Sequence, residues 1–229
     1  MIGIHETDVL VVGAGPVGLL TALLLNERGV RVQIIDEQWR GAAHSYACGL
    51  HPSSQTLLHS LGLMNSILSD GLHLNTVAFY EGARRHAAVK YAELDVDYPF
   101  LAVLRQDQLE RILAEALEQR GVRVGWNQRL AVLEPKDGYV EATIDHLAKV
   151  TAGYATARTE WTVDRVATTH AKFVVGADGI HSTVRRLTGL DVETVAPPQT
   201  FAVFEFRTHL DRGHELAVVF VDGTANVMW

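Results

Sequence analysis

A glycine-rich turn directly after a short apolar strand is the feature that most limits how this chain can fold. Residues 9–12 (VLVV) are apolar and β-favouring, as expected of a strand that a parallel sheet buries on both faces. The turn GAGPVG occupies residues 13–18, and the Leu- and Ala-rich residues 19–28 predict a helix that Gly29 ends. A second strand is predicted over residues 31–35. This order predicts a βαβ unit.

Each glycine of the turn has a physical reason to be glycine. Gly13 allows the tight turn, Gly15 lets a phosphate approach the backbone, and Gly18 lets the helix pack against the strand. Pro16 and Val17 complete the start of the helix, where free N–H groups and the positive end of the helix dipole would hold a pyrophosphate. The alternative is a glycine turn that only packs tightly, and the flanking strand and helix argue against it.

An acidic pair, Asp36 and Glu37, stands at the end of the second predicted strand. Asp36 follows Gly18 by 18 residues, which suits a carboxylate that accepts hydrogen bonds from ribose hydroxyls. Such a carboxylate repels a 2′-phosphate, so the bound nucleotide is predicted to be NAD or FAD and not NADP. The local sequence does not separate NAD from FAD.

A second strand–turn–helix segment, KFVVGADGIHSTVRR, occupies residues 172–186. Residues 173–175 predict a buried strand, residues 176–179 a turn, and a helix is predicted from His181 onward. The Gly-Asp-Gly turn would suit a phosphate or a ribose. The alternative is that Asp178 only caps the turn locally.

The remaining elements follow from periodicity and turn residues. Residues 106–120 form the clearest amphipathic pattern and predict a helix. Ser53 or Ser54 would cap a helix over residues 53–61, the triplet 84–86 reads as a solvated turn, and Asp137-Gly138 reads as a hairpin turn. Further strands are predicted over residues 76–80, 87–91, 122–124, 130–133, 139–144, 154–163, 201–207 and 216–221.

Composition and charge exclude several classes of protein. The net charge of −7 and the lack of a basic stripe argue against nucleic-acid binding. Residues 9–25 carry no charge, but glycines and a proline interrupt them and no basic segment precedes them, so neither a membrane span nor a signal peptide is predicted. A single cysteine, Cys48, excludes an internal disulfide and fits a reducing cytoplasm.

No metal site is predicted, because His44, His51 and His59 match no compact ligand spacing. Cys48, Met64 and Trp161 are interpreted as packing residues.

Three segments together resemble one family. GAGPVG with Asp36, then RQDQLERIL from Arg105, then VVGADGIHSTVR from Val174 occur in this order in class A FAD-dependent aromatic hydroxylases, of which para-hydroxybenzoate hydroxylase and phenol hydroxylase are the type. The resemblance covers residues 8–190. It implies FAD as the cofactor and an α/β fold: a doubly wound, Rossmann-like FAD-binding domain followed by a second, mainly antiparallel substrate domain.

The resemblance also implies roles for individual residues. The three glycines of the turn would hold the FAD pyrophosphate, and Asp36 the adenosine ribose. Gln106 stands where the family has a residue that contacts FAD. Asp178 and Gly179 match a motif that touches both FAD and the nicotinamide cofactor, and Arg185 matches the arginine of that motif.

This chain departs from the family pattern in two places. In SYACGLHP, Tyr46 stands where the family often has an arginine that serves the pyrophosphate or the nicotinamide cofactor, and Arg40 is the candidate to compensate. The downstream GDAAH-like motif is not present, so the chain resembles the N-terminal half of a hydroxylase. The expected domains are residues 1–190 for FAD and 191–229 for the start of the substrate sheet, to which residues 74–100 would add strands.

The activity that the resemblance implies is hydroxylation of a phenol-like aromatic molecule. NAD(P)H reduces FAD, O2 adds at flavin C4a, and the hydroperoxide attacks the ring, so no catalytic side chain is assigned. The expected partners are the aromatic substrate and O2, with a second copy of the chain or a missing C-terminal half. The alternatives are another FAD oxidoreductase, such as a reductase or a halogenase relative, and a non-catalytic flavin-binding fragment.

Overall fold

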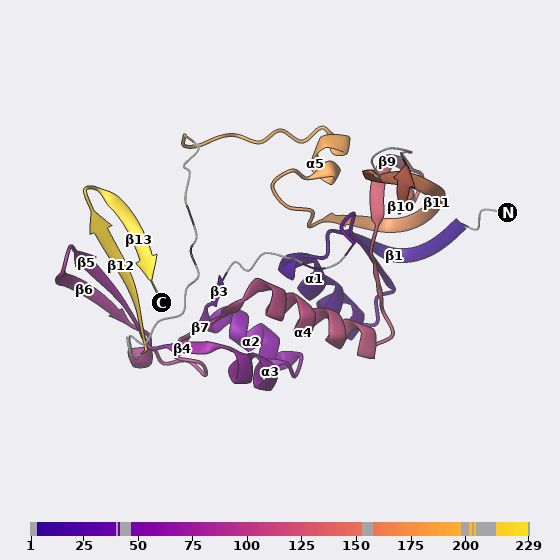
Figure 1. The fold of residues 1–229 in the computed structure, drawn as a ribbon. Coiled ribbons are helices and arrows are strands. Elements are labelled where there is room, and N and C mark those ends of the chain that lie inside the picture. Colours follow the sequence, from indigo (N-terminus) through magenta and orange to yellow (C-terminus); the bar gives the residue numbers. More distant parts are fainter. Residues whose placement is uncertain are drawn as a thin grey trace. The chain divides into compact units, whose positions relative to one another are not determined.

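The computed structural model describes residues 4–39, 41, 47–152, 158–197, 202, 204 and 214–228 (Figure 1). The chain divides into two compact units, each built from two stretches of sequence. The first unit consists of Met1–Ala43 and Glu110–Pro197, and the second of His44–Leu109 and Pro198–Trp229. Each unit is described by itself below.

The first unit contains a six-stranded sheet in the order β8-β2-β1-β11-β10-β9. Its parallel part consists of β8 (Val124–Gly125), β2 (Val32–Ile35), β1 (Ile4–Val12) and the end of β11 (Arg158–Gly176). β1 lies between β2 and β11, and its apolar residues 9–12 pair with both neighbours, as expected of a strand inside a parallel sheet. The predicted βαβ unit is therefore confirmed, because α1 (Pro16–Glu27) connects β1 to β2.

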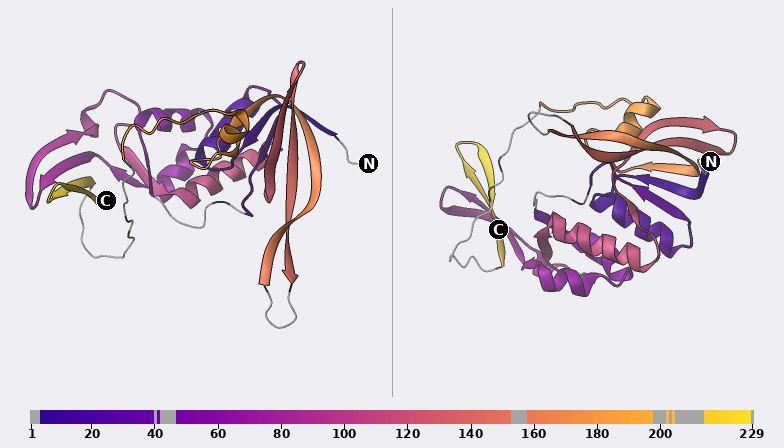
Figure 2. Two further views of the ribbon diagram at one scale, coloured as in Figure 1. Left: turned by 90° about the horizontal axis from the view of Figure 1, so that it is seen from above. Right: turned by 45° about the vertical axis from the view of Figure 1, so that its right-hand side comes forward.

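Helices cover one face of this parallel part (Figure 2). α1 buries Leu19, Ala22 and Leu23, and Gly29 follows it with φ +74°. The predicted amphipathic helix is confirmed as α4 (Gln106–Gln119), whose apolar face is buried. Arg120, directly after α4, donates to Glu27 at the end of α1 at 3.4 Å.

The other face carries an antiparallel meander of β9 (Gln128–Lys136), β10 (Tyr139–Ala152) and β11. A cluster of apolar side chains joins the meander to the parallel strands, and Val184 and Leu187 of α5 (Thr183–Thr188) pack against it. The buried members of the cluster are Leu10, Val12, Ile35, Leu130, Ala142, Ile144 and Ala171. The hairpin turn at Asp137-Gly138 is confirmed, with Gly138 at φ +83°.

The sequence predicted two separate strands where the structure has the single strand β11. Residues 158–171 of β11 pair with β10, and residues 168–176 pair with β1. Residues 168–171 pair with both β10 and β1, so β11 stays extended between the two predicted strands. Past Gln128, the first residue of β9, the strands β10 and β11 continue as a two-stranded ribbon (Figure 2).

The second unit contains a small antiparallel sheet with two helices. Its strands are β3 (Ala47–Leu50), β7 (Leu101–Arg105) and β4 (Leu72–Leu74). The helices are α2 (Pro52–Ser60) and α3 (Met64–Asp70). The prediction that Ser53 or Ser54 caps α2 was wrong: Pro52 takes the first helical position, so the cap falls on His51, which makes no side-chain cap hydrogen bond.

A four-stranded sheet completes the second unit in the order β13-β12-β5-β6. It brings together β5 (Thr76–Glu81) and β6 (Arg84–Lys90) with β12 (Glu215–Val221) and β13 (Thr224–Met228), and the short helix η1 (Tyr91–Glu93) follows β6. The triplet 84–86 belongs to β6, so its prediction as a turn was wrong. Gly82, at φ +57°, makes the turn earlier and lets the strand begin at Arg84. Most of the strand predicted over 201–207 lies outside the described residues.

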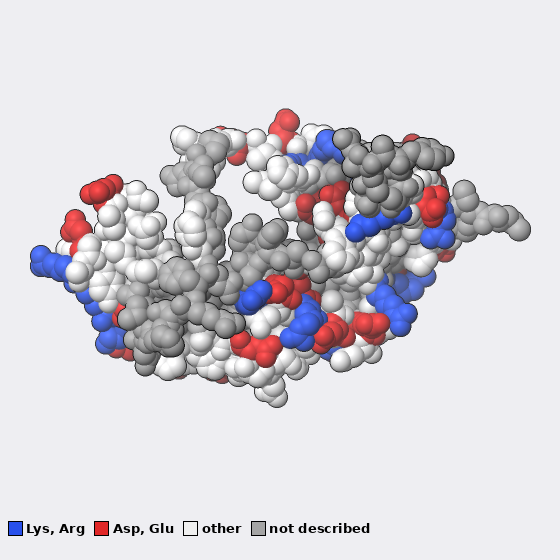
Figure 3. Space-filling view, in the orientation of Figure 1, with Lys and Arg blue, Asp and Glu red and all other residues white. Residues whose placement is uncertain are grey.

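Two of the predicted packing residues have described side chains. Met64 is 3% exposed, which confirms the prediction, whereas Trp161 is 43% exposed, so that prediction was wrong. Among the described residues, no helix combines the length and apolar character that crossing a membrane requires. On the face shown in Figure 3, positive and negative side chains are interspersed.

One carboxylate, that of Asp8, links three strands of the first unit. Asp8 lies in β1, Arg31 immediately precedes β2, and Lys172 lies in β11. Asp8 Oδ2 accepts from the backbone N and the Nε of Arg31 at 3.2 and 3.0 Å, and Oδ1 lies 2.9 Å from Lys172 Nζ. The hydrogen bonds from Arg31 and then Lys172 hold the pKa of Asp8 well below its ordinary value.

We expect Asp8→Asn to lower the melting temperature at neutral pH, because it removes the charge that these donors surround. The pKa of Asp8 is lower in the folded chain than in the unfolded chain. Its contribution to stability is therefore complete above about pH 4 and is lost as the pH falls toward the folded pKa. Thermal unfolding of both proteins should show a difference that stays constant from about pH 7 to about pH 5 and shrinks below about pH 4. Asp95→Asn, in an exposed loop, is the control, and a pH-independent difference would contradict the assignment.

Candidate cofactor-binding site

Two turns of the first unit pack backbone against backbone. Ala177, directly after β11, donates its N–H to the carbonyl of Val12 at 2.7 Å. Gly13 has φ +104°, and a Cβ atom there would lie 2.3 Å from the carbonyl oxygen of Ala177. The turn after β1 and the turn after β11 are therefore adjacent, and only glycine fits at position 13.

The other two glycines of the turn differ in the space around them: Gly18 is crowded and Gly15 is open. A Cβ atom on Gly18 would lie 1.9 Å from the carbonyl oxygen of Gly13, so Gly18 is required for the helix to start this close to the turn. A Cβ atom on Gly15 would meet no described atom within 4 Å. The backbone at Gly15 is thus open, and the approach of a phosphate to it stays a prediction.

The start of α1 has the properties of an anion-binding helix terminus. Gly15 is the N-cap residue and provides no side-chain cap, Pro16 occupies the first turn, and that turn contains no acidic residue. Val17 is 70% exposed. Backbone N–H groups of the first turn have no partner within an α-helix, and here they adjoin an open turn at the positive end of the helix dipole. A pyrophosphate fits this arrangement.

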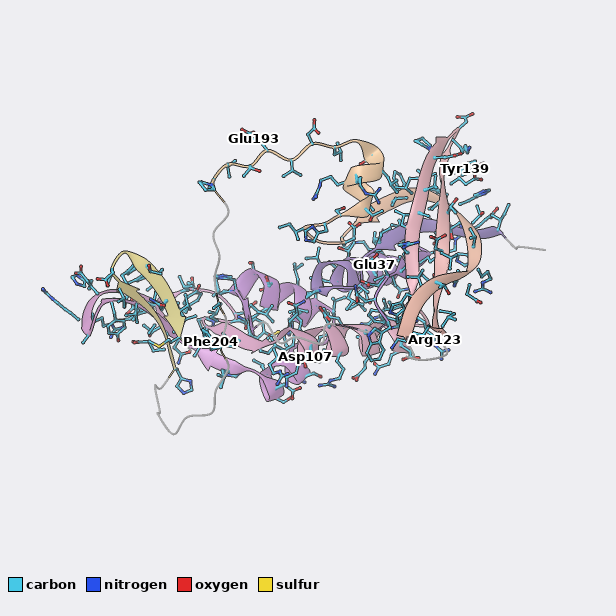
Figure 4. All side chains as sticks on the ribbon, turned by 45° about the horizontal axis from the view of Figure 1, so that its top comes forward. Glu37, Asp107, Arg123, Tyr139, Glu193 and Phe204 are labelled. Carbon is cyan, nitrogen blue, oxygen red and sulfur yellow. The ribbon has the colours of Figure 1, made fainter. Side chains whose placement is uncertain are left out.

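Asp36 lies beside the glycine turn and is bonded to it. Its Oδ2 accepts from the N–H of Ala14 at 2.7 Å, and its Oδ1 accepts from the N–H of Gln38 at 2.8 Å. A carboxylate has about four acceptor positions, so two remain for ribose hydroxyls. Sequence reasoning missed the bond to Ala14, which makes Asp36 part of the turn itself. Glu37 is exposed on the segment after β2 (Figure 4).

A second turn holds the end of β2 in place. The N–H of Asp36 donates to Gly125 O at 3.0 Å, and Asp36 O accepts from the N–H of Gln128 at 2.9 Å. Asn127, between them, has φ +56° and donates its N–H to Gln38 O at 2.8 Å. Residues 125–128 were not predicted as part of the site. An asparagine directly before a strand was the available signal, since asparagine tolerates this left-handed conformation.

Asp178 organises the start of α5. Its Oδ2 accepts from the N–H groups of Thr183 and Val184 at 2.7 and 3.1 Å, and its Oδ1 accepts from the Ser182 hydroxyl at 2.5 Å. Ser182 Oγ in turn accepts from the N–H of Arg185 at 3.1 Å. Asp178 therefore does cap the turn locally, which was the alternative to ligand binding that the sequence left open. Ser182 takes part in this capping, although sequence reasoning gave it no role.

The other predicted site residues are placed as follows. Gly179 has φ +77° and open space at its Cβ position, so a ligand can approach its backbone. Arg185 turns back and donates to Ile180 O at 2.7 Å. Gln106 is the first residue of α4 and belongs to the second unit, and its place near FAD stays a prediction. Arg40 and Tyr46 lie outside the described residues.

Comparison with known proteins identifies the chain's relatives. A family model described as "FAD binding domain" matches residues 6–217. Curated relatives include 6-methylpretetramide 4-monooxygenase from Streptomyces rimosus, 33% identical over 187 residues that cover 80% of this chain and 30% of that protein. Pentachlorophenol 4-monooxygenase from Sphingobium chlorophenolicum is 28% identical over 190 residues, which cover 82% of this chain and 32% of that protein.

A solved structure shows the same fold. The p-nitrophenol 4-monooxygenase from Pseudomonas putida DLL-E4 superposes with a TM-score of 0.70 at 28% identity, covering 81% of this chain and 44% of that chain. The chain thus spans less than half the length of these relatives. The match to the FAD binding domain family agrees with the parallel sheet and the open glycine turn described above.

Two alanine substitutions in the turn should have opposite effects. Gly18→Ala places a Cβ atom against Gly13 O, and we expect a loss of about 1–3 kcal/mol in the free energy of unfolding. Gly15 already has φ −71°, so Gly15→Ala should change stability by less than about 1 kcal/mol. The new methyl group would nevertheless occupy the space that a phosphate needs, and FAD affinity should fall.

Urea unfolding and FAD titration of both variants measure the two effects separately. Gly15→Ala serves as the matched control for stability. Unchanged FAD affinity in a folded Gly15→Ala protein would place the pyrophosphate elsewhere.

Proposed function

Because the chain belongs to the FAD binding domain family, we propose that it forms the flavin-binding part of an FAD-dependent monooxygenase. The reaction proposed is hydroxylation of a phenol-like aromatic molecule with NAD(P)H and O2. One oxygen atom enters the ring as a hydroxyl, the other leaves as water, and NAD(P)H is oxidised to NAD(P)+. The observation that carries this proposal is the open turn at Gly15, which adjoins both the start of α1 and the carboxylate of Asp36.

The residues of the first unit bind and orient the cofactor. The N–H groups at the start of α1 hold the pyrophosphate, and the free acceptor positions of Asp36 hold the adenosine ribose. The hydrogen bond from the N–H of Ala14 to Asp36 holds the glycine turn and the carboxylate in fixed positions before the cofactor binds. When bound, FAD supplies the hydride acceptor and the activation of O2, so the protein needs no nucleophile.

The turn at Asp178 and Gly179 supports a second contact with the cofactors. Asp178 fixes the start of α5, and the exposed, open backbone of Gly179 gives FAD or NAD(P)H a place to approach. Four further residues are proposed to lie near FAD and the nicotinamide cofactor, and only the family resemblance supports these roles. They are Arg40, Tyr46, Gln106 and Arg185.

We assign the substrate side of the protein to the second unit. Residues 74–100 and the chain after residue 190 both contribute to its four-stranded sheet, through β5, β6, β12 and β13. Val221 and Val227 of this sheet are about half exposed. Such apolar surface supports a partner that covers the sheet, either a second copy or a further part of a full-length hydroxylase. The single cysteine supports a reducing cytoplasm as its location.

The proposal is tested on the protein produced from its whole reading frame. We expect FAD to be bound without a covalent bond, and acid precipitation to leave it in a yellow supernatant. With a panel of phenols, NAD(P)H oxidation should be matched by O2 uptake and by a hydroxylated product detected by mass spectrometry. NAD(P)H oxidation that yields only hydrogen peroxide with every phenol, or a protein that binds no FAD, would overturn the proposal.

Asp178→Ala should weaken FAD retention and slow flavin reduction. It leaves the N–H groups of Thr183 and Val184 and the Ser182 hydroxyl without their acceptor, at a cost of about 1–2 kcal/mol in stability. Stopped-flow reduction by NAD(P)H at saturating FAD separates the two effects. Ser182→Ala, which removes one donor to Asp178 and the acceptor of the Arg185 N–H but keeps the Asp178 carboxylate, is the control. A normal reduction rate at saturation would confine Asp178 to FAD binding.

A further inference from the structure

Three side chains of the first unit meet at a position that no sequence motif indicated. Lys149 Nζ lies 5.2 Å from the ring centroid of Trp39 and 5.1 Å from that of Trp161. Lys149 in β10 and Trp161 in β11 are direct partners in the antiparallel register, and Trp39 lies on the segment after β2. We refer to these three residues as the Trp–Lys cluster.

Backbone hydrogen bonds place the cluster next to Asp36. Gln38 O accepts from the N–H of Asn127, and Asn127 O accepts from the N–H of Leu147, both at 2.8 Å. This chain of bonds connects the segment that follows Asp36 to β10, two residues before Lys149. Trp39, three residues after Asp36, is thereby held where the ribbon of β10 and β11 passes.

The exposure of the cluster is unusual for its residue types. Trp39 and Trp161 are 50% and 43% exposed, although tryptophan is normally buried in large part. The ammonium group of Lys149 lies against both rings, and the described residues provide no ion pair to it. Exposed indole surface combined with a hydrogen-bond donor suits a flat heteroaromatic ring that carries acceptor nitrogens.

The order of groups along a dinucleotide matches the order of the glycine turn, Asp36 and Trp39 in the protein. Pyrophosphate, ribose and base follow one another in the ligand. In the protein, the glycine turn is bonded to Asp36, and the chain continues from Asp36 to Trp39. A ribose held by Asp36 with its phosphate at the turn directs its base away from the turn.

We propose that the Trp–Lys cluster binds the adenine of the cofactor. Trp39 is the stacking platform, Lys149 donates to a ring nitrogen of adenine and holds both indoles, and Trp161 supports Lys149 from β11. This inference rests on the proposed function, because it requires an adenine dinucleotide at the glycine turn.

The test uses ligands that contain or lack adenine. ADP carries adenine, ribose and pyrophosphate, whereas FMN carries the flavin without adenosine. We expect Trp39→Leu to weaken ADP and FAD binding about tenfold, as the loss of a base-stacking partner does, and to leave FMN binding unchanged. Lys149→Met should weaken ADP binding by a smaller factor. Calorimetric titration gives the affinities, and quenching of indole emission by ADP should disappear in Trp39→Leu.

Controls separate this inference from loss of folding and from failure of the proposed function. Lys136→Met, a lysine of β9 that pairs with Glu134, should bind ADP as the parent does. Asp36→Ala should lose both ADP and FAD affinity. Circular dichroism checks folding, and Lys149→Met keeps the test valid if Trp39→Leu does not fold.

Each outcome decides one of the two proposals. If the parent protein binds FAD and ADP and the cluster variants bind them equally well, the adenine assignment is wrong and the proposed function stands. An equal loss of ADP and FMN, or a loss of phenol affinity with ADP affinity intact, also overturns the adenine assignment. A parent protein that binds neither FAD nor ADP overturns the proposed function, and this inference with it.

Discussion

The close approach of two backbone turns is the constraint on which the candidate site depends. Ala177 donates to Val12 O, and the carbonyl of Ala177 occupies the space that a side chain at Gly13 would need. β1 and β11 are adjacent parallel strands, so both turns emerge at the same edge of the sheet. The contact brings residues more than 160 positions apart into one site, and it makes the identity of Gly13 a requirement of tertiary structure as well as of local conformation.

Sequence patterns predicted those elements whose cause is local. The glycine turn, α1, α4 and the hairpin at Asp137-Gly138 were confirmed, because periodicity, Gly conformations and turn residues act within a few positions. The continuity of β11 was missed because it depends on two different neighbouring strands. The extent of β6 was misjudged for a related reason: Arg85 reads as solvated in the sequence, but it pairs across the sheet with Glu215 at 3.1 Å.

The same division applies to the candidate site. The residue types and spacings pointed to Gly13, Gly15, Gly18 and Asp36, and the geometry fits a pyrophosphate and a ribose. The sequence could not show that Asp36 is bonded to Ala14, or that Ser182 and the turn 125–128 support the acidic residues. Those contacts arise from where separate segments meet. Trp161 is the clearest case, because only the cross-strand register shows that it faces Lys149.

Asp36 is subject to two demands that restrict what can replace it. Its carboxylate accepts from Ala14 and Gln38, which fixes it against the turn. In the proposed function it also presents oxygens to a ribose. A neutral asparagine has only one acceptor oxygen, so it cannot accept both backbone bonds and still serve two hydroxyls. A longer glutamate would reach further from the strand end and would move the bond to Ala14. In the proposed function, the short, charged side chain of Asp36 therefore both holds the glycine turn in place and selects a ligand with ribose hydroxyls. Under the proposed function, residues of the first unit position the adenosine half of the cofactor, whereas Gln106, expected near FAD, belongs to the second unit.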